Sequence, residues 1–222
     1  MSQSQKVLPD TAQAKQDSMT VWLRVNTENS RNLELVVISA IQYNRYRRNY
    51  HLDIDKSESR IIRTSKEIKI KTLHRILTYQ ADTTNYSEFS YYKGYLPQLK
   101  AYIIDEVNAA NEISNLELVD SISGKLYIFE TAFDNSSAIP LPSPGLKFLL
   151  SYANDLYMQR GSSLSVLQIN RKAQHLYSEY SNYSFKDKKI ESICWINNSA
   201  FAVKLMPLEA TIPQYLRLRL KE

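Results

Sequence analysis

Short apolar runs and alternating apolar and polar positions recur along most of the chain, and both patterns are typical of β-strands. Three pairs of these runs are separated by short turn segments, so each pair predicts a β-hairpin. The turn residues are Thr64-Ser65-Lys66, Ser123-Gly124 and Asn197-Asn198-Ser199. Residues 73–79 form an element of unclear type, and residues 82–95 favour an aromatic, polar loop. The runs that predict strands cover residues 19–25, 52–55, 60–63, 67–71, 116–119, 126–133, 164–169, 190–196, 200–206 and 215–221.

Other stretches have the apolar spacing of helices. Leu99, Ile103 and Val107 follow one another every four residues. They come after Pro97, a residue that suits the first turn of a helix. This pattern predicts a helix over residues 97–112.

Three more helices are expected. Residues 143–156 predict a helix, because Ser143 provides a cap before a leucine-rich stripe. Residues 171–180 predict a short helix. The stretch 33–50 fits a helical stripe behind a cap at Ser30, but its many β-branched residues also suit a buried strand. We expect a helix there.

The order of these elements predicts the fold class. Hairpins interspersed with helices, without a regular β-α-β rhythm, predict an α+β fold in which a mostly antiparallel sheet, built from hairpins, packs with three or four helices. A chain of 222 residues is long enough to bury the core of one domain. Residues 1–18 are polar and lack an apolar pattern, so we expect a flexible N-terminal tail followed by a single α+β domain over residues 19–222.

The composition is that of an ordinary globular protein, with 43% apolar and 23% charged residues. No apolar run is long enough to span a bilayer, and residues 1–18 lack the apolar core of a secretory signal. We therefore expect no membrane insertion and a cytoplasmic location. The single cysteine, Cys194, excludes an intrachain disulfide, and its place in an apolar run predicts a buried thiol rather than a nucleophile.

Motifs of common cofactor sites are absent from the sequence. The four glycines are isolated from one another, so neither a Walker A loop nor a Rossmann fingerprint is present. His51, His74 and His175 match no zinc-binding spacing, and one cysteine accompanies them. We expect no metal and no cofactor.

A metal-dependent nuclease is the one enzymatic alternative that the sequence offers. Asp53 or Asp55 together with Glu67-Ile68-Lys69 matches an acid plus acid-x-lysine pattern, in which two carboxylates hold a divalent metal and the lysine contacts the phosphate. The same pattern is common in any basic hairpin, where the charges are simply solvated. We therefore expect a binding protein rather than an enzyme.

Charge is distributed unevenly along the chain. Residues 41–75 hold ten Lys or Arg residues and four acids, a net charge of +6. Residues 76–142 hold three basic residues and nine acids, a net charge of −6, and residues 143–222 hold eleven and six, a net charge of +5. A basic segment favours a phosphate-bearing or acidic partner, and an acidic segment favours a basic partner.

The most distinctive stretch is residues 41–51, which contains three tyrosines and three arginines. In a helix, Tyr43, Tyr46 and Tyr50 lie on one stripe, and we expect this end of the helix to project beyond the core. Tyrosine rings stack on unpaired bases and arginines pair with phosphates, so the stretch predicts binding of RNA or single-stranded DNA. The candidate binding residues are Tyr43, Arg45, Tyr46, Arg47, Arg48, Tyr50, Lys69 and Lys71.

Two other interpretations of this stretch stay open. Tyr and Arg dominate protein interfaces, so the same residues and the acidic middle segment also suit a subunit that assembles with other proteins. A solvated helix end, with arginines that complement the helix dipole, explains the stretch without any partner. Clustering of residues 41–75 with the C-terminal cations on one face favours nucleic acid, whereas a basic face opposite an acidic face favours protein assembly.

Overall fold

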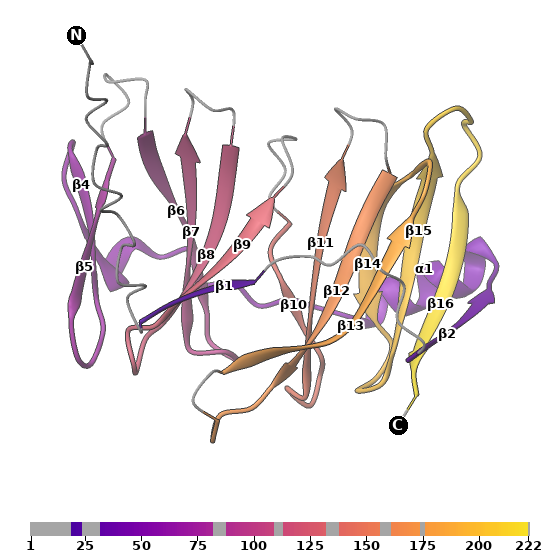
Figure 1. Ribbon diagram of the computed structural model, residues 1–222, viewed down its shortest axis with the longest axis horizontal. Coiled ribbons are helices and arrows are strands. Elements are labelled where there is room, and N and C mark those ends of the chain that lie inside the picture. The colour runs from indigo at the N-terminus through magenta and orange to yellow at the C-terminus, as the bar shows by residue number, and fades with distance from the viewer. Residues whose placement is uncertain are drawn as a thin grey trace, which may run out of the picture.

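The computed structural model describes residues 19–23, 32–81, 88–108, 113–131, 138–155, 161–173 and 176–221. These residues form sixteen strands, one α-helix and one 3₁₀-helix (Figure 1). The fold is therefore mostly β, and the prediction of an α+β fold with three or four helices is wrong. The helices are α1 (Ala40–Asn49) and the 3₁₀-helix η1 (Glu58–Arg60). The strands are β1 (Thr20–Leu23), β2 (Leu33–Val37), β3 (Ile61–Arg63), β4 (Glu67–Lys71), β5 (Ile76–Gln80), β6 (Glu88–Leu96), β7 (Ala101–Asn108), β8 (Ile113–Asp120), β9 (Leu126–Thr131), β10 (Leu141–Pro142), β11 (Phe148–Asp155), β12 (Gly161–Ile169), β13 (Tyr177–Phe185), β14 (Lys188–Trp195), β15 (Ala200–Pro207) and β16 (Gln214–Leu220).

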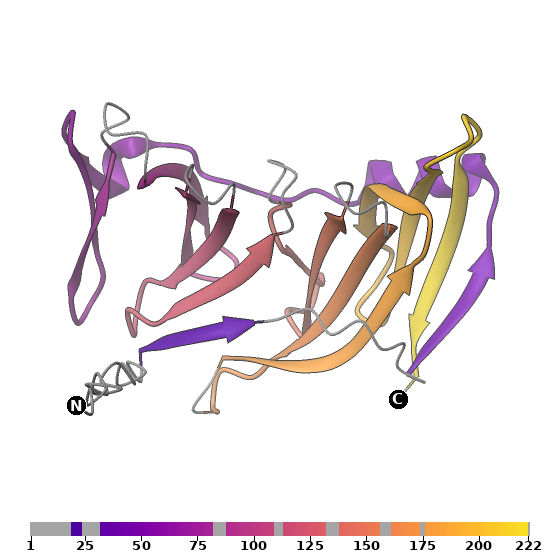
Figure 2. The ribbon, with the colours of Figure 1, turned by 45° about the horizontal axis from the view of Figure 1, so that its top comes forward.

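Four sheets stand in a row, and we number them I to IV along it (Figures 1 and 2). Sheet I has the strand order β3-β4-β5, and sheet II has the order β1-β9-β8-β7-β6. Sheet III has the order β10-β11-β12-β13, and sheet IV has the order β14-β15-β16-β2. Neighbouring strands of these sheets are antiparallel, apart from the parallel pair of β1 and β9.

The N-terminal half of the chain connects the two ends of the row. Strand β2 completes sheet IV at one end, and α1 packs on the same sheet. Residues 50–57 then form an extended strap that runs along the row to η1 and sheet I at the other end (Figure 2). Two backbone hydrogen bonds between Asp55 and Tyr95, of 2.9 and 2.8 Å, fasten the strap to β6. The basic segment 41–75 is therefore divided between opposite ends of the molecule.

Three apolar clusters fill the spaces between successive sheets. Ile68 and Ile70 of sheet I pack against Ile104 of sheet II, and further clusters join sheet II to sheet III and sheet III to sheet IV. Sheets II and III are thus covered on both faces, whereas sheets I and IV each turn one face outward. The strands of the middle sheets can therefore be apolar at every position.

This two-sided burial explains why the helix predicted over residues 97–112 is wrong. Residues 97–100 form a turn, and β7 follows. Ile103 packs towards sheet III and Ile104 packs towards sheet I, so consecutive residues are both buried. A spacing of four is also a multiple of the two-residue strand period, so the spacing of Ile103 and Val107 fits a strand as well as a helix.

The helices predicted over residues 143–156 and 171–180 are also wrong, the first of them for the same reason. Strand β11 occupies most of the first range, with Leu149 and Leu150 buried in different clusters on its two faces. Ser143 does cap a turn, because its Oγ accepts hydrogen bonds from the backbone N–H groups of residues 147 and 148, at 3.1 Å each. The chain then leaves this turn as a strand. In the second range, a turn over residues 170–173 leads to β13.

The ambiguous stretch 33–50 contains both of the expected structures. Residues 33–37 form β2 and residues 40–49 form α1. The helix is capped by Ser39 rather than by Ser30, which lies outside the described residues. Ser39 and Gln42 form a capping box, in which the backbone N–H of Gln42 donates to Ser39 Oγ at 3.2 Å.

The predicted hairpins are confirmed. Strands β8 and β9 flank the turn at Ser123-Gly124, where Gly124 adopts a φ of +72° that suits glycine. The hairpins β3–β4 and β14–β15 and the alternating strand β16 are also present.

Residues 82–95 are not simply a loop, because β6 begins at residue 88. The predicted tail, residues 1–18, lies outside the described residues. Within the described part of the chain, no helix has the length and apolarity needed to cross a bilayer.

Candidate nucleic-acid interface

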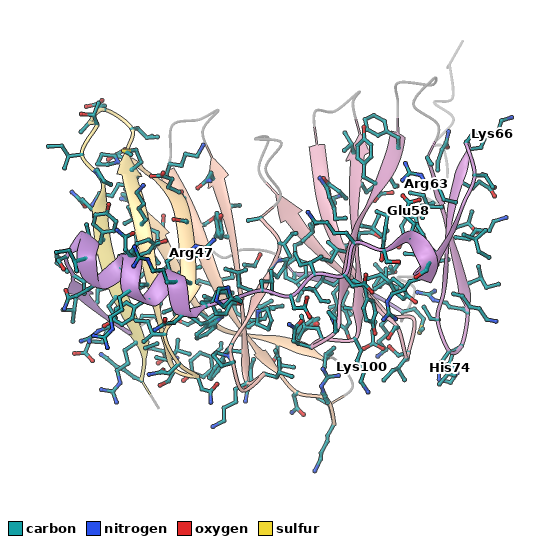
Figure 3. All side chains as sticks on the ribbon, turned by 180° about the vertical axis from the view of Figure 1, so that it is seen from behind. Arg47, Glu58, Arg63, Lys66, His74 and Lys100 are labelled. Carbon is teal, nitrogen blue, oxygen red and sulfur yellow. The ribbon has the colours of Figure 1, made fainter. Side chains whose placement is uncertain are left out.

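Helix α1 lies across the outer face of sheet IV (Figure 3). The contacts of Tyr43 show that this face carries Tyr215 of β16 and Ser192 of β14. The ring of Tyr43 lies 5.2 Å from the ring of Tyr215, and its hydroxyl lies 2.6 Å from Ser192 Oγ. The small side chains of Ser192, Cys194 and Ala202 leave room for the helix to pack closely. Cys194 is buried, as predicted, and its burial raises the pKa of the thiol to about 11.

The tyrosine stripe of α1 faces the protein core. Tyr43 is 2% exposed, and burial raises its pKa to about 12. Tyr50 is also buried, and its hydroxyl donates to the backbone carbonyl of Pro142 at 3.0 Å. Tyr46 is half-buried against the same apolar cluster. The three tyrosines do share one side of the helix, but Tyr43 and Tyr50 hold α1 and the strap in place and present no open ring face for stacking on a base.

The arginines of α1 reach solvent from two sides of the helix. Arg45 and Arg48 lie away from Tyr43, whereas Arg47 follows Tyr43 by one turn and lies at the margin of the packed side. Arg45, Arg47 and Arg48 are all exposed, and Arg47 and Arg48 occupy the last turn, where they complement the helix dipole. Among the salt bridges between described residues, none involves these three arginines. Their charges are therefore directed towards solvent.

Strand β16 adds cations to the same face. Paired residues of neighbouring strands share a face, and Tyr215, which contacts α1, is paired with Lys204. Arg217 and Arg219 follow Tyr215 at every second position and so lie on this face too, both exposed. The alternation of leucine and arginine along β16 therefore gives this strand a cationic outer side.

We call this combined surface the basic face. Two acids of the described residues lie next to its cations. Glu34 on β2 is paired with Arg219 on β16, and Glu191 forms a 2.8 Å salt bridge with Lys204. Cations thus outnumber acids on it, which suits a polyanion. The cations of the basic face are Arg45, Arg47, Arg48, Lys204, Arg217 and Arg219.

Lys69 and Lys71 do not join the basic face. They lie on β4 in sheet I, at the other end of the row, where Figure 3 also places Lys66 and His74, far from Arg47. Lys69 Nζ lies 2.8 Å from Glu67 Oε2, so its charge is paired locally.

Asp55, Glu67 and Lys69 of the nuclease alternative are engaged in other contacts. The carboxylate of Asp55 accepts hydrogen bonds from Arg60 Nε at 2.7 Å and from the backbone N–H of Ser57 at 2.9 Å. The bond to Arg60 lowers the pKa of Asp55. Glu67 is paired with Lys69, and the described residues contain no group of three or more His, Cys, Asp or Glu side chains arranged to hold a metal.

Sequence reasoning missed the contribution of Lys204, Arg217 and Arg219 to the candidate site. The signal was present in the alternation of β16, but nothing local connects that strand to residues 45–48. Comparison with known proteins adds no further assignment, because no protein-family model, no curated protein and no solved structure matches this chain.

Proposed function

We propose that this protein is a non-enzymatic module that binds nucleic acid through the phosphate backbone, with the basic face as the contact surface. The observation that carries the proposal is that the three arginines of α1 and the cations of β15 and β16 gather on one face, although more than half of the chain separates them in sequence. Arginine side chains pair with phosphates in a bidentate manner and keep their charge at all physiological pH values.

The burial of Tyr43 and Tyr50 changes the expected mode of binding. Base stacking on these rings would require the helix to leave sheet IV, so the contact is to phosphates and is independent of unpaired bases. Binding of this kind depends strongly on salt, because each neutralised phosphate releases counterions. Duplex and single-stranded nucleic acids should therefore both bind.

A charge-matched pair of triple variants tests the proposal. Arg45, Arg47 and Arg48 are replaced by Gln in one variant, and Lys66, Lys69 and Lys71 of sheet I are replaced by Gln in the control. Fluorescence anisotropy titrations with duplex DNA, single-stranded DNA and RNA at two salt concentrations give the affinities and the salt slopes. The arginine variant should lower the slope by about one for each arginine that contacts a phosphate, and the lysine variant should leave it nearly unchanged.

Two results would contradict the proposal. One is a wild-type affinity no better than about 10⁻⁴ M at physiological salt, the weak end of non-specific binding. The other is an equal loss of binding in both triple variants, which would mean that net charge alone, and not the basic face, determines the affinity.

Assembly with another protein is the second candidate function. Val36, which is paired with Arg217, and Ile41 of α1 lie beside the cations of the basic face and are 39% and 82% exposed. Apolar residues beside arginines are typical of protein interfaces. The assembly alternative also relied on the acidic segment 76–142 as a docking surface. Fewer of its acids reach the surface than the sequence indicates, because Asp105, Glu117 and Asp120 are buried. Loss of a protein partner in an Ile41→Ser variant, with nucleic-acid affinity unchanged, would favour assembly.

A further inference from the structure

A second basic site lies between sheets II and III, away from the basic face. Three turns meet there: residues 97–100 before β7, residues 121–125 between β8 and β9, and residues 170–173 between β12 and β13. They enclose a cavity of about 380 Å³. Figure 3 shows Lys100, one of its lining residues, in the middle of the row and well separated from Arg47 on α1.

Hydrogen bonds between the turns fix the shape of this cavity. The backbone N–H of Ser121 donates to the carbonyl of Lys100 at 2.8 Å, and Arg171 Nη2 donates to the carbonyl of Gln98 at 3.1 Å. Within the β8–β9 turn, the backbone N–H of Asp120 donates to the carbonyl of Lys125 at 3.0 Å. The cations of the cavity are thus attached to a cross-linked frame rather than to independent loops, which reduces the entropy lost when a ligand binds.

The lining is positively charged. Lys100, Lys125 and Arg171 come from the three different turns, and Asp120 is the one acid among the lining residues. The Oδ1 atom of Asp120 already accepts hydrogen bonds from the backbone N–H groups of Ile122 and Ser123, at 3.0 and 2.6 Å, and from Ser123 Oγ. Asp120 therefore shapes the β8–β9 turn, and Lys100, Lys125 and Arg171 give the lining a positive net charge.

One buried tyrosine, Tyr127, lines the cavity, and a second, Tyr177, packs behind it. The hydroxyl of Tyr127, a lining residue, accepts a hydrogen bond from the backbone N–H of Leu176 at 3.0 Å and keeps its own hydrogen to donate. The ring of Tyr177 packs edge-on against that of Tyr127 at 4.6 Å. The Tyr177 hydroxyl is fully buried and has no hydrogen-bond partner among the described residues, which is uncommon for a polar group away from water.

These features indicate a site for a small anion. A volume of about 380 Å³ is at the lower end of the range for small-molecule sites, and Ile122 and Leu176 supply an apolar wall beside the charges. We propose that this cavity binds a small organic molecule that carries an oxyanion, a phosphate or a carboxylate, with Lys100, Lys125 and Arg171 as its partners and the Tyr127 hydroxyl as a further donor. The proposal is independent of nucleic-acid binding, because no residue of the cavity belongs to the basic face.

Calorimetric titration with inorganic phosphate, ribose 5-phosphate and citrate tests this site. Saturable binding of ribose 5-phosphate without citrate would assign a phosphate ester, and the reverse would assign a carboxylate. Arg171→Gln and Lys125→Gln should each weaken binding about tenfold, the loss expected for one charge-assisted contact. Tyr127→Phe should weaken binding several-fold, because it removes the hydroxyl donor.

Two controls keep the test specific. Lys172→Gln removes the same charge next to Arg171, but Lys172 does not line the cavity, so binding should stay within about twofold. The triple arginine variant of α1 should bind the small anions like wild type. The proposal is overturned if none of the three probes binds below about 10 mM, or if Lys172→Gln weakens binding as much as both cavity variants do.

Discussion

Sheets I and IV end the row on opposite sides, and each packs one face on a neighbouring sheet and turns the other face outward. The outer face of sheet IV is covered by α1, whose exposed side carries arginines without salt bridges to described residues. The outer face of sheet I has no helix on it in the described part of the chain, and Ile62 and Ile76 are 61% and 62% exposed there.

The two ends differ in whether the cations of the basic segment 41–75 are paired with acids. At the sheet I end, Arg60 pairs with Asp55, Arg63 pairs with Glu58, and Lys69 pairs with Glu67. At the sheet IV end, the arginines of α1 meet further cations from β15 and β16. The net charge of a segment therefore does not describe a surface, because local acids neutralise one end and tertiary packing reinforces the other.

The largest expected effect concerns the anchor of α1. Tyr43→Ala removes a buried ring and its hydrogen bond to Ser192, so it should lower the free energy of unfolding by about 3–5 kcal/mol, as measured by chemical denaturation. Tyr43→Phe keeps the ring and should lose only about 0.5–1.5 kcal/mol. A loss below ~1 kcal/mol for Tyr43→Ala would show that α1 is not firmly packed on sheet IV.

The next effect concerns a buried acid between sheets I and II. Tyr79 on β5 donates a hydrogen bond to Glu117 Oε2 on β8 at 2.9 Å. Burial, and next the nearby Glu106, raise the pKa of Glu117 from 4.5 to about 7. A carboxyl with a raised folded-state pKa contributes stability that is fully present below the unfolded pKa and is lost as the pH rises through the folded pKa.

The free energy of unfolding of the wild-type protein should therefore fall between about pH 5 and pH 8. The fall should exceed that of the Glu117→Gln variant by on the order of 2–3 kcal/mol, because glutamine cannot ionise and keeps an acceptor for Tyr79. Denaturant titrations of both proteins at the two pH values measure this difference. If the two proteins respond identically to pH, Glu117 does not titrate in this range.

A smaller effect is expected for the paired cations of sheet I. Lys69→Gln removes an exposed salt bridge to Glu67, so the free energy of unfolding should change by less than about 1 kcal/mol and the change should shrink at high salt. Chemical denaturation at low and high salt measures it. A larger, salt-insensitive loss would mean that sheet I uses this pair as a structural contact.

The smallest effect is expected on the outer face of sheet I. Ile76→Thr keeps a β-branched side chain at an exposed strand position, so stability should stay within about 0.5 kcal/mol of wild type. Denaturation at two protein concentrations provides the check. A loss that grows with protein concentration would indicate that another copy of the chain covers this face.

Much of the local structure was predictable from the sequence. The turns at Ser123-Gly124 and Asn197-Asn198-Ser199 marked real hairpins, and the alternation of β16 marked its inner and outer sides. The tyrosines of α1 also share one side of the helix, as their spacing predicts. In each of these cases the pattern is local, because turn chemistry and side-chain periodicity depend on neighbours in the chain.

Tertiary structure alone decided what covers each of these sides. Strands β7 and β11 are apolar on both faces because sheets stack against each face, and such runs cannot be distinguished from buried helices by periodicity. The tyrosine side of α1 became core because sheet IV lies beneath it. Arg47 shares a face with Arg217 because the start of α1 is attached to β16, where the backbone N–H of Ile38 donates to the carbonyl of Tyr215 at 3.0 Å. Periodicity determines which side chains point the same way, but burial and long-range pairing determine whether that direction leads to solvent, to a partner or into the protein.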